Sequence, residues 1–559
     1  MGKLGRRALV LLVAALSMLV FAACGDDDDD DGGGGGGGGA ATKGGELNVA
    51  HTSFPDFLDP GLSYTVDGWE ALHLAYTGLV TFANGNGDAG TEGAEVVPGL
   101  AEDMPEISDD GLSYKFTLRD GLKYSDGKPV KASDFKSSIE RLLEQDSQGA
   151  GLGYTSIKGG ADFLETKKGG VSGIVTDNAK RTIEITLAEP RGAFLYELAI
   201  PFASVVPGDT PAKNMTKSPP PGTGCYAIED VNLNRSYELV RNKNFSPSLK
   251  GTAVDQCNAD AIHVTIDPQT SSQVTKVLRG DLDFMVDNPP PDRVAELKGK
   301  YDDRFEQFPT NSTFYFFMDV EAPPFDNLKV RQAVNYAIDV NAINRAQGGV
   351  LSSAHTTLPP GVPGYDKSQD DLYPFDLEKA KSLIKEAGAE GEDVTVWSNP
   401  EPETQRTMEY YADTLNKIGL KAKIKNIPAE EYFVTIGTRK NKPQTGWANW
   451  FQDYPHPSDF IDILLNPDNV VDVGNNNYTY NANDKKLADM INDLNKEPEL
   501  TDDVIKRWGE VDRYIQEQAY WGIYGNRKQS TFFSERMDFD SCKGEHAVWT
   551  HHWGMFCRK

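Results

Sequence analysis

Residues 107–130 read ISDDGLSYKFTLRDGLKYSDGKPV, and this stretch combines two turn signals with one strand signal. The tripeptides DDG at 109–111 and SDG at 125–127 are typical of hairpin turns. Glycine adopts a positive φ without steric cost, and aspartate side chains bind nearby backbone amides. Between the turns, Ser113–Leu118 has high β-propensity and partial alternation, which predicts a strand. The stretch therefore predicts local β-structure that builds the fold.

The same signals along the chain predict a mixed α/β protein without a simple βαβ repeat. Strands are predicted at Glu46–Ala50, Ser113–Leu118, Arg181–Leu187, Ser236–Val240 and Phe314–Met318. Apolar residues at helical spacing predict helices at Ser133–Leu143, Val330–Arg345, Asp376–Ala387, Glu403–Ile418 and Thr501–Gln518. Asp376 and Thr501 are predicted N-caps, and Gly388 is predicted to end the helix that Asp376 begins.

The composition indicates a globular protein that does not bind nucleic acid. The 559 residues include 84 Asp and Glu against 56 Lys and Arg, and the formal net charge of −28 repels phosphate backbones and anionic lipid headgroups. Hydrophobic residues make up 39% of the chain and aromatic residues 10%, which is typical of a folded body. At about 150 residues per domain, the length allows roughly two to four domains.

The first 23 residues are typical of an export signal. Three basic residues precede the apolar stretch 8–23, which is short for a membrane span. The stretch ends in FAAC at 21–24, which resembles a lipobox, where the cysteine thiol accepts diacylglycerol before cleavage. We expect lipidation of Cys24 to anchor the protein at the outer face of a bacterial cell membrane. The alternative is an ordinary signal peptide followed by an incidental cysteine.

Residues 24–44 are predicted to form the lipidated end and a solvated tether. Asp26–Asp31 and Gly32–Gly39 can bury no apolar surface. Calcium binding by the aspartates is the alternative, but the run lacks the spaced ligands and the fixed turn of a calcium loop. The folded body is expected from about residue 45 onward, in an oxidising extracytoplasmic space.

The sequence carries none of the common catalytic motifs GxSxG, HExxH or GxxxxGK[ST]. A thiol nucleophile at Cys225 with a base such as His263 is an enzyme alternative, but nothing in the sequence fixes that pair. We therefore expect no enzyme activity, no cofactor and no metal.

Apart from Cys24, the cysteines form two close pairs, Cys225 with Cys257 and Cys542 with Cys557. The first pair brackets two predicted strands, and a hairpin with a returning loop can bring both ends within bridging distance. An oxidising location favours a disulfide within each pair. Zinc is the alternative at the C-terminus, where the sequence offers Cys542, His546, His551, His552 and Cys557. Their spacing fits no standard zinc finger.

Further motifs occur in a fixed order around 107–130. They are LDP at 58–60, YTGLV at 76–80, PGLAE at 98–102, PPFDN at 323–327, VRQAVNYAID at 330–339 and DYP at 453–455. This ordered set, which extends over nearly the whole mature chain, resembles family 5 of the extracellular solute-binding proteins. The family serves ABC importers, chiefly for oligopeptides and dipeptides. The resemblance implies that this chain captures extended peptides and delivers them to a membrane permease driven by ATPase subunits.

The resemblance implies an α/β fold of the two-lobed periplasmic-binding-protein type II class, with an extra peripheral subdomain and a ligand cleft between the lobes. It implies a discontinuous first lobe at 45–77, 205–306 and 523–559. The peripheral subdomain is expected at 78–204 and the second lobe at 307–522. A monomer is expected.

The resemblance also implies a ligand site at 447–457, WANWFQDYPHP. In peptide-binding members a strand here pairs with the ligand backbone, and an aspartate at the position of Asp453 receives the peptide α-ammonium. Trp450 matches a pocket-lining tryptophan, and Tyr524 matches a tyrosine near the hinge. Trp447 and Asn449 belong to the same segment and complete the expected ligand-binding set. The alternative is that Asp453 caps a turn and the tryptophans belong to the core.

Two departures from the family pattern leave the ligand class open. The usual GTGPY reads GTGCY at 222–226, and Phe451 stands where some oligopeptide binders have a cysteine. The sequence identifies no cation for a peptide C-terminus. Oligosaccharides, metal chelates and haem remain alternative ligands, and a peptide-sensing receptor without transport is an alternative role.

Overall fold

The computed structural model describes residues 43–85, 92–538, 541–542 and 544–559. The predicted signal peptide at 1–23, Cys24 and nearly all of the predicted tether lie outside these residues. Among the helices of the described ranges, none is long and apolar enough to cross a membrane.

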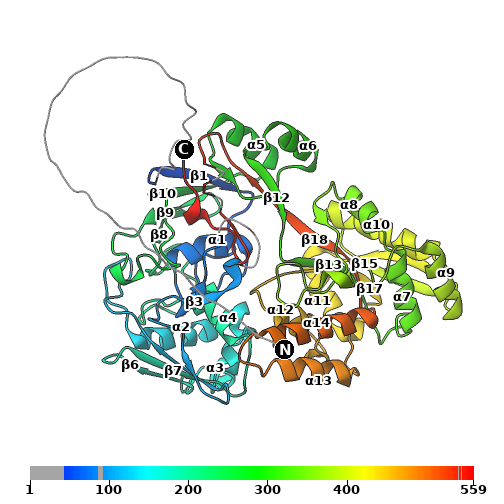
Figure 1. Ribbon diagram of the computed structural model, residues 1–559, viewed down its shortest axis with the longest axis horizontal. Coiled ribbons are helices and arrows are strands. Elements are labelled where there is room, and N and C mark those ends of the chain that lie inside the picture. Colours follow the sequence, from blue (N-terminus) through cyan, green and yellow to red (C-terminus); the bar gives the residue numbers. More distant parts are fainter. Residues whose placement is uncertain (1–42, 86–91, 539–540, 543) are drawn as a thin grey trace, which may run out of the picture. The chain divides into compact units, whose positions relative to one another are not determined.

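The first sheet joins the start of the described chain to strands that come much later in the sequence (Figure 1). Its five strands follow the order β11-β1-β10-β9-β8; β1 runs parallel to β10 and β11, and β10, β9 and β8 are antiparallel. The strands are β1 (Glu46–His51), β8 (Tyr226–Asn232), β9 (Ser236–Arg241), β10 (Ala261–Ile266) and β11 (Phe284–Met285). Helices of the same part are α1 (Val66–Ala75), α5 (Thr270–Arg279) and α6 (Pro291–Lys300).

A smaller antiparallel sheet of the order β4-β5-β7-β6 lies in the segment between α1 and β8. Its strands are β4 (Glu106–Ile107), β5 (Ser113–Thr117), β6 (Ile174–Asp177) and β7 (Thr182–Thr186), and β2 (Val80–Phe82) pairs separately with β3 (Val96–Pro98). The helices are α2 (Ala132–Glu144), α3 (Gly160–Thr166) and α4 (Phe194–Ala199). One buried apolar cluster contains Val49 of the first sheet and Phe116 of this one, so the two sheets share a core.

The second large sheet has seven strands, with the main order β12-β18-β13-β17-β15-β16 and with β14 paired to β18. The strands are β12 (Phe305–Pro309), β13 (Ser312–Met318), β14 (Leu351–Ser352), β15 (Asp393–Ser398), β16 (Lys421–Asn426), β17 (Thr445–Phe451) and β18 (Trp521–Phe532). The long strand β18 lies beside both β12 and β13 (Figure 1). The lobe and subdomain boundaries expected from the sequence stay a prediction.

Helices cover both faces of the second sheet, and β13 shows why. Phe314 and Phe316 belong to one buried cluster, whereas Tyr315 and Phe317 belong to another, because successive side chains of a strand point to opposite faces. The helices are α7 (Leu328–Ala337), α8 (Val340–Ala346), α9 (Leu377–Glu386), α10 (Pro402–Lys417), α11 (Tyr432–Ile436), α12 (Pro457–Leu465), α13 (Lys485–Leu494) and α14 (Asp502–Glu517).

All five predicted strands are present, and four of the five predicted helices match one helix each. Asp376 and Thr501 accept hydrogen bonds from the backbone N–H groups of Lys379 and Val504, which confirms both N-caps. The prediction of a single helix at Val330–Arg345 is wrong. The chain leaves the helical conformation at Ile338, and Asp339 begins α8 by accepting a hydrogen bond from the N–H of Ala342.

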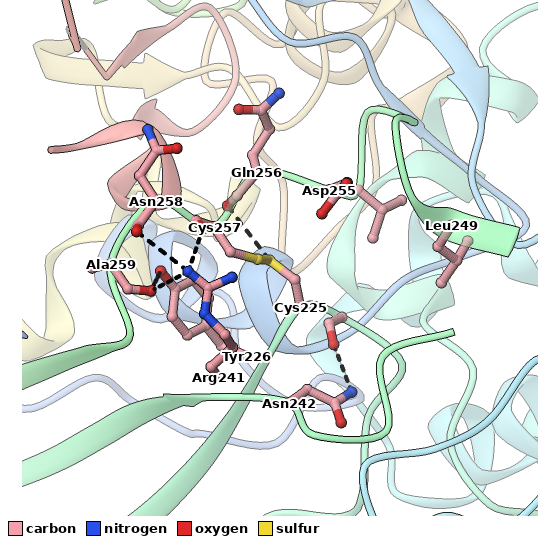
Figure 2. Close-up of a disulfide and its surroundings, with 12 residues drawn as sticks. Cys225, Tyr226, Arg241, Asn242, Leu249, Asp255, Gln256, Cys257, Asn258 and Ala259 are labelled. Atoms are coloured by element: carbon pink, nitrogen blue, oxygen red, sulfur yellow. Dashed lines mark hydrogen bonds between the residues drawn. A yellow bond between two sulfur atoms is a disulfide. The ribbon is translucent and has the colours of Figure 1, made fainter. Parts of the chain in front are cut away.

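Both predicted cysteine pairs are disulfides, with Cα–Cα distances of 6.2 Å for Cys225–Cys257 and 5.6 Å for Cys542–Cys557. Figure 2 shows the first bridge beside the β8–β9 hairpin, where the Arg241 guanidinium donates to the carbonyl oxygens of Cys257 and Ala259 at 2.7 and 3.0 Å. Cys225, the nucleophile of the enzyme alternative, is therefore bound in a disulfide and has no free thiol. The same holds for Cys542 and Cys557, the two cysteine ligands of the zinc alternative. His551 of the zinc alternative contacts the Glu70 carboxylate instead, at 3.1 Å.

We predict that the double substitution Cys225→Ser/Cys257→Ser lowers the free energy of unfolding of the mature protein by about 4 kcal/mol, because the bridge closes a loop of sequence separation 32. The pair Cys542→Ser/Cys557→Ser, with a separation of 15, should cost slightly less, about 3 kcal/mol. Urea unfolding of both variants beside the unchanged protein measures the losses. Unfolding curves that coincide with that of the unchanged protein would contradict the prediction.

Candidate functional site

Strand β17 is paired unequally on its two sides. It pairs with β13 over all seven residues, from Thr445 to Phe451. On the other side it pairs with β15 only at Thr445 and Gly446. Within the described residues, no strand continues this second edge beyond Gly446, so the edge is open from Trp447 onward.

The main-chain groups that face the open edge belong to the odd-numbered residues. Gln452 donates its N–H to Asn311, on the β13 side, at 2.9 Å. Because main-chain groups alternate along a strand, residues 447, 449, 451 and 453 direct theirs the other way. Two contacts agree with this assignment. The Trp447 carbonyl accepts from the Tyr432 hydroxyl at 2.9 Å, and the Asp453 N–H donates to the Asp459 carboxylate at 2.9 Å.

Three of the five predicted ligand residues line one cavity of about 270 Å³. Trp447, Asn449 and Phe451 share one face of β17, and Tyr524 of β18 and Phe314 of β13 lie on the same side of the sheet. The opposite wall comes from the start of α10, including Glu403, which pairs with Arg527 of β18. The predicted residues Trp447 and Asn449 of β17 and Tyr524 of β18 are thus brought together at one cavity, with β13 between their two strands.

Trp450 lies elsewhere. It occupies the opposite face of β17, where it packs against the buried cluster that contains Tyr315 and Trp508. It lines neither this cavity nor the one beside Asp453. The structure therefore separates Trp450 from Trp447 and Asn449, and its role in binding stays a prediction.

Asp453 follows the end of β17 and is 8% exposed. Its carboxylate accepts a hydrogen bond of 2.5 Å from the hydroxyl of Tyr64, which precedes α1. Both residues line a second cavity of about 210 Å³, together with Trp69, Phe451 and the C-terminal residues Val548 and Trp549. Phe451 lines both cavities, so the two cavities lie next to each other at the end of β17.

The surroundings of Asp453 are unfavourable for its negative charge. Burial raises the pKa of Asp453 to about 7, and the hydrogen bond from Tyr64 opposes this shift. Burial and the charge of Asp453 raise the pKa of the neighbouring Asp459 well above its ordinary value. Among the described residues, no Lys or Arg forms an ion pair with Asp453. A cationic ligand group would therefore supply the missing positive charge.

The sequence did not identify Tyr64, Arg527 or Glu403 as site residues. It also did not identify the C-terminal residues Val548 and Trp549, which line the cavity beside Asp453. Tyr64 is 389 positions from Asp453 in the sequence, and no local pattern links the two. The sequence identified Phe451 only as a departure from the family pattern, and the structure shows that it lines both cavities. Alternation along the strand could also have separated Trp450 from Trp447.

We predict that Tyr64→Phe raises the pKa of Asp453 further and lowers the free energy of unfolding by about 1–3 kcal/mol, because a buried carboxylate loses its hydrogen-bond donor. Chemical denaturation measures the stability, and the pH dependence of unfolding reports the pKa. Tyr237→Phe is the matched control, since the Tyr237 hydroxyl is buried and has no hydrogen-bond partner among the residues that the structure describes. A loss as large in the control would show that the Tyr64–Asp453 contact is not the cause.

The site combines an unpaired sheet edge with a buried carboxylate that no described cation neutralises. Residues 95–472 match the profile of bacterial extracellular solute-binding proteins, family 5 (middle region), and the chain belongs to this family. Membership confirms the predicted family, the two-lobed α/β class and an extracytoplasmic solute-binding role. Members of this family are binding proteins rather than catalysts.

Relatives with known ligands are similar over most of the chain. The dipeptide-binding protein of Escherichia coli is 29% identical over 432 residues, which cover 74% of this chain and 77% of the relative. Heme-binding protein A of Haemophilus influenzae is 30% identical over 501 residues, 84% of this chain and 83% of the relative. The solved structure of HbpA2 from Haemophilus parasuis superposes with a TM-score of 0.75 at 23% identity, covering 92% of this chain and 100% of the other, which supports the fold.

Proposed function

We propose that this protein captures short extended peptides with a free α-ammonium group and delivers them to the permease and ATPase subunits of an ABC importer. The similarity to a dipeptide-binding protein over about three quarters of both chains supports the peptide class. The observation that carries the proposal is Asp453, a buried carboxylate that no described cation neutralises, at the end of an open strand edge.

An α-ammonium group fits the charge that Asp453 presents. Every unmodified peptide has this group, and a charge-assisted hydrogen bond to a buried carboxylate is stronger than a neutral one. The Tyr64 hydroxyl donates a hydrogen bond to Asp453, so the lone pairs of its oxygen stay available to accept a second hydrogen bond from the ammonium. An N-acetylated peptide would leave the buried carboxylate unpaired, which costs free energy.

The peptide backbone is proposed to add a strand to the open edge of β17. Main-chain groups of Asn449 and Phe451 face this edge, and strand addition uses such groups without reading side chains. The six steps from Trp447 to Asp453 span about 20 Å at ~3.3 Å per residue, which suits a short oligopeptide. Trp447, Asn449 and Tyr524 would then surround the ligand side chains on one face.

Attachment through diacylglycerol at Cys24 is proposed to hold the protein at the outer face of the bacterial membrane, as a monomer. The FAAC sequence at 21–24 and the adjacent Asp and Gly runs support this arrangement. Mass spectrometry of the N-terminal peptide and Cys24→Ser, which should release the protein into the medium, test it.

Haem is the second candidate ligand, because Heme-binding protein A is 30% identical over 84% of this chain. A Soret absorbance titration of the mature protein separates the two candidates. Saturable haem binding that peptides do not displace would favour haem over peptides.

We predict that Asp453→Asn weakens the binding of free-amine peptides by at least about tenfold, since the ammonium loses its countercharge. Isothermal titration of a short peptide and of its N-acetylated form measures the effect, and the variant should remove the preference for the free amine. Asp489→Asn, on the exposed side of α13, is the matched control. If free and acetylated peptides bind the unchanged protein equally well, the ammonium role of Asp453 is refuted.

We predict that peptide affinity falls as the pH is lowered below 7. Burial raises the pKa of Asp453 to about 7, so acid protonates the carboxylate in the free protein, whereas the ammonium requires its ionised form. The dissociation constant should rise roughly tenfold per pH unit between pH 7 and 5. Titrations across this range in Asp453→Asn should show a flat profile. An equally steep profile in that variant would assign the pH dependence to another group.

A further inference from the structure

The cavity beside Trp447 and Asn449 carries an excess of negative charge. Glu401 and Glu403, at the start of α10, line it together with a single cation, Arg527. Glu403 forms an ion pair with Arg527. Among the described residues no Lys or Arg forms an ion pair with Glu401, whose carboxylate accepts a hydrogen bond from Asn399 at 3.4 Å, so the three charged groups carry a net charge of −1.

The remaining lining also favours a positively charged group. Phe314, Trp447 and Phe451 contribute aromatic rings, whose faces attract cations. Gln347 is 6% exposed, and its side-chain Nε2 donates to Thr407, but its Oε1 has no hydrogen-bond partner within the described part of the chain. A buried acceptor without a partner costs free energy until a donor reaches it, and a guanidinium or ammonium is a donor with no acceptor atoms.

We propose that this cavity is a subsite for one positively charged side chain of the bound peptide, arginine or lysine. The inference rests on the proposed peptide-binding function and adds a preference within it. Glu401 supplies the countercharge, the aromatic rings contact the cation, and Gln347 accepts one of its N–H groups. The volume of about 270 Å³ equals that of roughly nine water molecules, which leaves room for one long side chain.

The pairing geometry decides which ligand residues reach the cavity. Side chains of directly opposite residues in neighbouring strands lie on the same face of a sheet. A ligand residue opposite Asn449 or Phe451 therefore directs its side chain into the cavity, whereas the residues before and after it point to the other face. The preference for a cation should consequently alternate along the peptide.

Tetrapeptides with free amino termini test the subsite on the mature protein. Tetra-alanine is compared with peptides that carry one arginine at each position in turn and with the same peptides carrying citrulline, which has a similar shape but no charge. Calorimetric titration should show arginine binding about tenfold tighter than citrulline at a given position, with little difference at the positions next to it.

Substitutions on α10 identify the source of the preference. Glu401→Gln and Glu403→Gln should each reduce the arginine-to-citrulline affinity ratio toward one. Glu409→Gln is the matched control, because Glu409 is exposed on the same helix and does not line the cavity. The ratio compares two ligands on one variant, so a general loss of stability does not mimic the effect.

The outcomes separate this inference from the proposed function. If tetrapeptides bind but arginine and citrulline are equal at every position, the subsite is overturned and peptide binding stands. The series also includes tetrapeptides with one glutamate at each position. If these bind tightest, Arg527 receives an anion and the subsite is again overturned. If no tetrapeptide binds, including tetra-alanine, both proposals fail.

Discussion

The open edge of β17 is the constraint on which the site depends. β13 satisfies one edge of the strand completely, whereas β15 diverges after Gly446. Backbone N–H and C=O groups need partners, so the outward groups of Asn449 and Phe451 must bind water or a ligand main chain. The edge is short and lies beside cavities lined by other elements, which limits what can pair with it.

Two buried carboxylates at the end of this edge oppose folding and favour binding. Asp453 and Asp459 are both buried, and in the described structure the Asp453 carboxylate accepts its hydrogen bond from a neutral group, the Tyr64 hydroxyl. Such an arrangement destabilises the free protein, because burial disfavours the ionised forms and like charges repel. In the proposed function, a ligand ammonium would reduce both the cost of burying the charge and the repulsion. Stability of the second sheet and affinity for a cation are therefore linked through the same two side chains.

Local patterns were sufficient to predict the strands, most helices and both disulfides, because each depends on residues close in the sequence. The break at Asp339 was missed, since apolar spacing continues through a position whose side chain caps a new helix. The resemblance indicated Asp453, but not its partner Tyr64, because that contact depends on how the chain folds back. Arg527 escaped notice for the same reason: its pairing with Glu403 joins β18 to α10.

In the two proposals, tolerance of many peptide sequences and selectivity for particular ligand side chains come from different parts of one site. In the proposed function, the strand edge and Asp453 would contact only groups that every peptide shares, so these contacts would bind many sequences with similar free energy. Discrimination must then come from side chains on alternate faces of the ligand, and only one face meets the cavity formed with α10. The net negative charge of this cavity would change the affinity for charged ligand side chains without altering the contacts to the peptide main chain and ammonium. The family scaffold can therefore acquire a ligand preference through a few residues of one helix.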